Sequence, residues 1–303
     1  FCIGGSFGGG NAAQSNQATV VLKELLGLES TAAGAIIGII LAILVGVIII
    51  GGIKRIASVT EKVVPFMAGL YVLACLYILG VNFSLIDDAF SLIFREAFNP
   101  TAIGVGGFIG VLLVGFKRAA FSNEAGAGSA SIAHSAVKTK YSASEGMVAL
   151  LEPFIDTVVV CTMTALVLII TGFVDPMNPP ANDAQAILLT SSAFESSISW
   201  FPYVLTVAVV LFAFSTMISW SYYGFQGWSY LFGRSKKMEY IYKLIFCVFV
   251  IIGSAASLNS VIDFSDAMIF AMMVPNMIGI IILAPKVKSE LNKYMKAIKS
   301  MKV

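Results

Sequence analysis

Long apolar stretches alternate with short polar ones along the whole chain. A helix needs about 20 apolar residues to cross about 30 Å of hydrocarbon at about 1.5 Å per residue. Seven stretches meet this need, and residues 1–22 have the composition of the end of an eighth helix. The seven run over residues 32–53, 63–83, 103–137, 148–173, 203–224, 241–258 and 264–285. The pattern predicts an all-α protein that crosses a lipid bilayer several times.

The composition supports a membrane protein and excludes several other classes. Of the 303 residues, 58% are hydrophobic and 12% are charged, which is about half the charged share of an ordinary soluble domain. The net charge of +2 gives no reason to expect nucleic acid as a partner. The four cysteines lie far apart and there is one histidine, so neither a disulfide framework nor a zinc site is predicted.

The charges are distributed unevenly between alternate loops. Fifteen of the nineteen Lys and Arg residues fall around residues 54–62, 138–140 and 234–243 and in the tail 286–303, while the other loops are rich in Asp and Glu. Cytoplasmic loops carry the excess of cations in membrane proteins. We therefore expect a plasma-membrane protein with a cytoplasmic C-terminus, whose basic tail 286–303 rests on anionic headgroups.

The stretch 103–137 carries charges where the middle of the bilayer is expected. Lys117 and Glu124 are among them, and each such charge costs about 2.5–3.5 kcal/mol on insertion scales. Gly126 adds a residue that favours non-helical backbone. We expect a helix broken at mid-membrane, with Phe121–Gly126 uncoiled and enclosed by protein or lining a cavity. The alternative is two short helices joined outside the membrane, which would put a long apolar stretch on the wrong side of the charge asymmetry.

Other polar residues also lie at membrane depth. Asn11 and Gln14 are three residues apart and are expected to share a helix face. The carbonyl of Phe212, with the hydroxyls of Ser215 and Thr216 three and four residues later, offers hard oxygen ligands to Na⁺. The alternative is that these hydroxyls bond to their own helix, as Ser and Thr commonly do.

Three acidic or basic residues at depth have simpler interpretations. Glu152 and Asp156 are four residues apart and share a face, either as a gate or as a contact between helices. His134 is expected to be a structural histidine with its hydrogen bonds satisfied. Asn276 follows Pro275, whose ring leaves a backbone carbonyl unbonded and so adds a polar position to the last span.

Several motifs together resemble the alanine or glycine:cation symporter family. They are residues 121–126 with Gly128 and Ser129, residues 152–157 with 160–162, residues 212–216 running to 220–224, residues 51–56, and Gly10 and Asn11 with Gln14. The resemblance covers essentially the whole chain. It implies a five-plus-five inverted-repeat transporter fold in one transporter domain, 1–303. The chain would start in the third core helix, so that core helices three to ten are present and the first two, with half of the site, are missing.

The resemblance also implies the site residues. The expected substrate-binding residues are Asn11, Gln14, Phe121, Ser122, Asn123, Glu124, Gly126, Trp220 and Asn276. The expected Na⁺ ligands are Phe212, Ser215 and Thr216. One departure affects pocket size, because Ala119 stands after Arg118 where the family pattern has a smaller residue, usually Gly.

The function implied is secondary active symport of small neutral amino acids, alanine or glycine, with Na⁺ as coupling ion and no cofactor. A proton-coupled amino-acid transporter and a channel-like conductor are the alternatives. An enzyme using Glu124, Asp156 and His134 is disfavoured because the sequence has no nucleophile elbow, metal cluster or cofactor motif. The sequence leaves the oligomeric state open.

Overall fold

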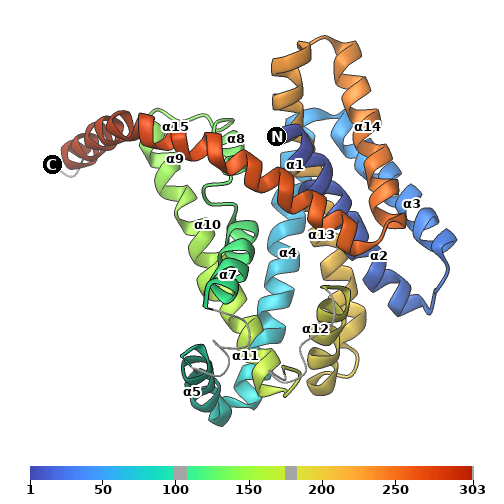
Figure 1. Ribbon diagram of the computed structural model, residues 1–303. Coiled ribbons are helices and arrows are strands. Elements are labelled where there is room, and N and C mark those ends of the chain that lie inside the picture. Colours follow the sequence, from blue (N-terminus) through green and yellow to red (C-terminus); the bar gives the residue numbers. More distant parts are fainter. Residues whose placement is uncertain (99–107, 175–182, 302–303) are drawn as a thin grey trace. The chain divides into compact units, whose positions relative to one another are not determined.

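The computed structural model describes residues 1–98, 108–174 and 183–301, and that part of the chain is helical without any strand. Residues 103–107 of the interrupted stretch and Lys302 of the tail lie outside it. The chain divides into two compact units. Unit 1 comprises Phe1–Phe94 and Met163–Ile269, and unit 2 comprises Arg95–Thr162 and Phe270–Val303. Figure 1 shows the helices of both, and each unit is described by itself.

Unit 1 contains most of the long helices. They are α1 (Cys2–Phe7), the π-helix η1 (Gly8–Ala12), α2 (Ala13–Leu26), α3 (Thr31–Ile50), α4 (Gly52–Val81), the 3₁₀ turn η2 (Phe83–Leu85), most of α5 (Ile86–Ala97), α11 (Thr162–Ile170), α12 (Asp183–Ser197), α13 (Phe201–Phe232), α14 (Lys236–Ala255) and the start of α15 (Leu258–Met301). Unit 2 contains α7 (Phe108–Asn123), α8 (Ser129–His134), α9 (Ser142–Ala149), α10 (Leu151–Pro153), the π-helix η3 (Phe154–Cys161) and the rest of α15.

Six helical segments are long and apolar enough to cross a membrane: Thr31–Ile50, Gly52–Val81, Ser142–Ile170, Phe201–Phe232, Lys236–Ala255 and Leu258–Ser300. Each covers most of one of the expected apolar stretches, so the prediction of a multi-pass helical membrane protein is confirmed. The interrupted stretch is not among the six, because α7 has only 16 residues.

Several helices run well beyond the apolar stretches. Residues 54–62, expected as a loop, form the first turns of α4, and the basic tail continues α15 as far as Met301. Lys, Arg and Glu are good helix formers. Hydrophobicity therefore marks where the bilayer lies, and not where a helix ends.

Small residues bring α3 and α14 close together in unit 1. A Cβ at Gly34 would lie 2.8 Å from the Ser254 carbonyl oxygen, and one at Gly38 would lie 2.7 Å from the Ser254 Cβ. Such distances leave no room for a side chain. Backbones that approach this closely gain packing contacts that larger residues would prevent.

On α13, Gly224 leaves room for two buried side chains in the same way. Ser6 and Tyr242 form a hydrogen bond of 3.2 Å between their hydroxyls, and both side chains are fully buried. The Tyr242 ring stacks on Phe7 with centroids 5.6 Å apart. A Cβ at Gly224 would collide with both hydroxyl groups.

We expect Gly224→Ala to destabilise unit 1 by about 1–3 kcal/mol, because it overpacks a buried site and separates the two hydroxyls. The measurement is the thermal unfolding midpoint of the purified full-length protein. Gly227→Ala is the matched control on the same helix, since a Cβ there meets its nearest atom at 3.4 Å. An unfolding midpoint lowered equally by both substitutions would contradict the packing argument.

Candidate functional site

The break in the interrupted helix is present in unit 2. Helix α7 ends at Asn123 and α8 begins at Ser129, so residues 124–128 lie between them without helical structure. Three of these residues have positive φ: Glu124 (53°), Gly126 (82°) and Gly128 (103°). Glutamate rarely adopts this conformation, which costs about 1–3 kcal/mol and persists where the surroundings impose it. A break in this helix is therefore present, and its position at mid-membrane stays a prediction.

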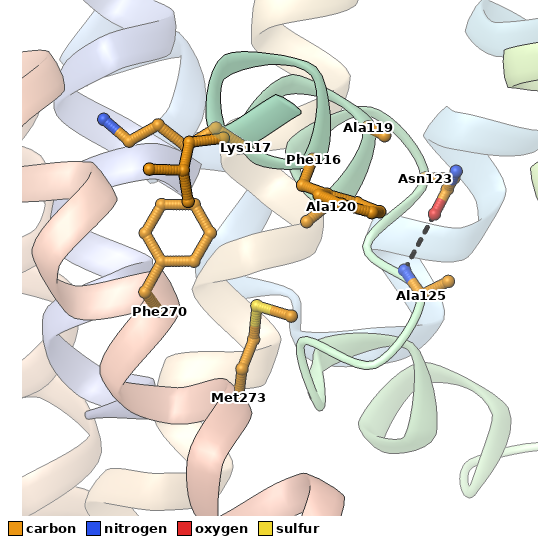
Figure 2. A pocket seen from close by; sticks show the side chains of 9 residues that line it. Phe116, Lys117, Ala119, Ala120, Asn123, Ala125, Phe270 and Met273 are labelled. Carbon is orange, nitrogen blue, oxygen red and sulfur yellow. Dashed lines mark hydrogen bonds between the residues drawn. The ribbon is translucent and has the colours of Figure 1, made fainter. Parts of the chain in front are cut away.

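Its position differs from the expected one. Phe121, Ser122 and Asn123 were expected to be uncoiled but form the last turn of α7, and the uncoiled segment continues past Gly126 to Gly128. The helix stops where the Asn123 Oδ1 accepts a hydrogen bond of 3.0 Å from the backbone nitrogen of Ala125, drawn as a dashed line in Figure 2. A side chain that binds the following backbone competes with helix continuation.

Helix η3 holds the end of α7. The Ser122 hydroxyl donates to the Asp156 carboxylate, and the Asn123 Nδ2 donates to the Thr157 hydroxyl at 2.8 Å. Asp156 therefore makes a contact between helices, which is one of the two interpretations given for it. Ser122 and Asn123 bond to η3 through their side chains, while their backbone stays helical.

Helix α15 holds the middle of the uncoiled segment. The Asn276 Nδ2 donates to the Gly126 carbonyl oxygen at 2.9 Å, and a Cβ at Gly128 would lie 3.2 Å from the Asn276 Cβ. Within the segment, the Ser129 hydroxyl donates to the Glu124 carboxylate. The structure thus brings Asn276 together with Glu124 and Gly126, residues predicted for the same site from distant parts of the sequence.

A cavity of about 670 Å³ lies beside the end of α7. Figure 2 shows side chains from α7 and α15 around it. Its lining consists of Leu113, Phe116, Lys117, Ala119, Ala120, Asn123, Ala125, Phe270 and Met273. Phe270 and Met273 were not among the predicted site residues, although Phe270, Met273 and Asn276 follow one another at intervals of three and so lie towards one side of the helix.

The remaining predicted substrate residues lie in unit 1, in its packed interior or close to it. Asn11 is fully buried and donates to the Phe246 carbonyl oxygen at 2.7 Å. Gln14 is half-buried and donates to the Gly9 carbonyl oxygen at 3.0 Å. The two amides therefore have different partners, because the π-helix η1 changes the spacing between faces. Trp220 is 3% exposed. Substrate contact by these three residues stays a prediction.

The proposed Na⁺ ligands also lie in unit 1, on α13. The Ser215 hydroxyl donates to the Phe212 carbonyl oxygen at 2.9 Å. This is the bond to the same helix that was given as the alternative. A carbonyl and a hydroxyl oxygen each keep a further lone pair after such a bond. Na⁺ binding by Phe212, Ser215 and Thr216 stays a prediction.

The shape of the uncoiled segment should depend on Gly128. We expect Gly128→Ala to destabilise the segment by about 1–3 kcal/mol, because alanine is strained at φ 103° and its Cβ would press on Asn276. The measurement is the rate of limited proteolysis at residues 124–128 in the full-length protein. The matched control is Gly115→Ala in α7, where nothing lies within 4 Å of a new Cβ. Equal proteolysis of the two variants would argue against the strain.

Comparison with known proteins places the chain among transporters. The sodium:alanine symporter family matches residues 1–303. The sodium/alanine symporter of Methanococcus maripaludis is 40% identical over 94% of this chain and 61% of its own length. A probable sodium/glutamine symporter of Bacillus subtilis is 30% identical over 94% of this chain and 58% of its own.

A sodium/proton-dependent alanine carrier protein of Bacillus sp. strain PS3 is 28% identical over 88% of this chain and 62% of its own length. The chain spans about three fifths of the length of these relatives. The family match over the whole chain agrees with the broken helix and the membrane spans described above. The chain belongs to the sodium:alanine symporter family.

Proposed function

We propose that the full-length protein imports small neutral amino acids, alanine first, by symport with Na⁺. It would be a multi-pass protein of the cell membrane with its C-terminus in the cytoplasm. The proposed architecture is the five-plus-five inverted repeat, of which this chain supplies core helices three to ten. The observation that carries the proposal is the uncoiled segment 124–128 inside an otherwise helical, apolar protein of this family.

A broken helix suits a zwitterionic substrate. Helix α7 points its C-terminal, partially negative end at the segment, and the Glu124 carboxylate lies there too. Both favour an ammonium group. Transporters of this general kind place substrate and coupling ions at discontinuous helices, where unwound backbone supplies polar groups. In this proposal Glu124 and the last carbonyls of α7 meet the substrate's ammonium group.

The coupling ion in the proposal is Na⁺. The names of all three relatives described above include sodium, and one also includes protons. Moving one positive charge down a potential of 100 mV supplies about 2.3 kcal/mol, and the concentration gradient adds to it. The three oxygens on α13 are the proposed Na⁺ ligands, which need not be charged, since Na⁺ accepts neutral carbonyl and hydroxyl oxygens.

In this proposal the cavity beside α7 limits the size of the substrate side chain. Ala119 and Ala120 line it, where the family pattern led us to expect a smaller residue after Arg118. We propose that this wall receives the substrate side chain and accommodates alanine. The name of one relative includes glutamine, which indicates that substrate size varies among relatives at this level of identity.

The first test is uptake of radiolabelled alanine by full-length protein in proteoliposomes. We expect accumulation with an inward Na⁺ gradient and little when choline replaces Na⁺.

The same assay tests the role of Glu124. Glu124→Gln should reduce uptake about tenfold or more, because a charge-assisted contact to the ammonium group is lost. Glu195→Gln, at an exposed position on α12, is the control and should keep normal uptake. Equal uptake with Na⁺ and with choline would refute sodium coupling, and an alanine-independent conductance would favour the channel alternative.

The second test concerns the side-chain wall. Ala120→Leu should reduce alanine uptake more than glycine uptake, by about tenfold in the ratio of kcat/KM, because the added carbons fill space that the substrate methyl group needs. Ala57→Leu on the exposed face of α4 is the control and should leave the ratio unchanged. An unchanged alanine-to-glycine ratio in Ala120→Leu would show that this wall does not contact the substrate side chain.

A further inference from the structure

The single histidine of the chain stands between two carboxylates in unit 2. The His134 Nδ1 lies 2.7 Å from the Glu145 Oε1, and its Nε2 lies 3.7 Å from the Glu152 Oε2. The histidine is the last residue of α8, whereas Glu145 belongs to α9 and Glu152 to α10. The side chains of His134 and Glu145 are 27% and 18% exposed, and that of Glu152 is 50% exposed.

The number of protons on the ring decides how many of these contacts are attractive. A neutral imidazole has one N–H and one nitrogen lone pair, whereas an imidazolium has two N–H groups. A neutral ring that donates to Glu145 turns its lone pair towards Glu152. Only the protonated ring attracts both carboxylates. We propose that His134, Glu145 and Glu152 form a proton-binding site.

The position of this site in the chain means that the bound proton affects how firmly α8 is held. The broken helix is held to the following helices on both sides of its uncoiled segment. Before the segment, Ser122 and Asn123 bond to Asp156 and Thr157 of η3. After it, His134 is held by Glu145 and Glu152. The bonds of Ser122 and Asn123 to η3 do not involve an imidazole. The contacts of His134 with both carboxylates are complete only when the imidazole is protonated. Loss of the proton therefore loosens α8 and leaves the end of α7 in place.

Other charged groups lie on the neighbouring segments of unit 2. Lys138 and Lys140 follow in the turn before α9, and the Lys140 Nζ lies 5.6 Å from the centre of the Tyr141 ring. On α15, Tyr294 contacts Tyr141, and one residue before it Lys293 pairs with Glu290 at 2.6 Å. On the broken helix itself, Glu124 accepts from Ser129, and on η3 Asp156 accepts from Ser122. Of these side chains, imidazole is the one whose ordinary titration lies between about pH 5 and 8.

This site adds regulation to the proposed function and, for its effect on transport, rests on it. Proton binding would hold α8 against α9 and α10, so the rate of sodium-driven uptake should vary with pH through His134. The sequence-based interpretation of His134 as a structural histidine with its hydrogen bonds satisfied makes a different prediction. A neutral ring bonded to Glu145 alone would hold α8 equally well at every pH in this range.

Hydrogen exchange of the full-length protein in lipid nanodiscs, without substrate, distinguishes a proton-binding His134 from a purely structural one. Peptides covering residues 129–137 are compared at about pH 5.5 and about pH 8, with labelling times scaled for the intrinsic rate of exchange. We expect about twofold to fivefold greater protection at the lower pH, the size of one half-exposed ion pair lost. Residues 115–123, held by η3, should show no such difference. Equal protection of 129–137 at both pH values would overturn the proposal.

Substitutions assign the effect to the three side chains. His134→Gln should abolish the pH difference, and Glu152→Gln should largely abolish it because the bond to Glu145 is available to the neutral ring as well. Ser135→Ala is the matched control, since its hydroxyl bonds only to the Ile132 carbonyl oxygen, and it should keep the full difference. A pH difference that persists in both His134→Gln and Glu152→Gln would also overturn the proposal. Because no substrate is used, failure of alanine transport would leave this result unaffected.

Discussion

Inside a bilayer, every backbone N–H and C=O needs a hydrogen-bond partner from the protein or from a water-filled cavity, because lipid offers none. This constraint would apply to the uncoiled segment 124–128 at the membrane depth proposed for it. Its backbone groups find some of their partners in side chains: Asn123 accepts from Ala125, and Asn276 donates to Gly126. The polar residues near the break therefore replace helical hydrogen bonds. Removing one leaves a backbone group without its hydrogen-bond partner.

The two units use different means to keep their helices together. In unit 1, Gly34, Gly38 and Gly224 let backbones or buried side chains approach until no Cβ fits between them. Such packing leaves little room for movement, since interiors at this density do not deform gradually. In unit 2, the broken helix is held by side-chain hydrogen bonds, including the one between His134 and Glu145. These are separate contacts that can open one at a time.

Hydropathy predicted six of the seven expected long spans because the bilayer imposes one length and one composition on them. It did not predict where helices end, as α4 and α15 show, since charged residues continue a helix into water. The break was predictable from Gly126 and Glu124. Its first residue was not, because the end of α7 depends on Asn123 meeting Thr157, which is 34 residues away in sequence. For the same reason, the sequence did not reveal that Asn11 faces the Phe246 carbonyl.

Glu152 and Asp156 are two carboxylates four residues apart whose contacts with the broken helix differ in their dependence on pH. They were expected to share a face, and both contact the broken helix, on either side of its uncoiled segment. Asp156 receives a hydroxyl proton that stays on Ser122 at any physiological pH. Glu152 faces the imidazole of His134, which attracts a carboxylate on both of its nitrogens only in the protonated form. An ionic interaction also gains strength where water is scarce. The contact made by Asp156 is therefore independent of pH, whereas the one proposed for Glu152 depends on it. Both are carboxylates, so the difference comes from the partner side chain.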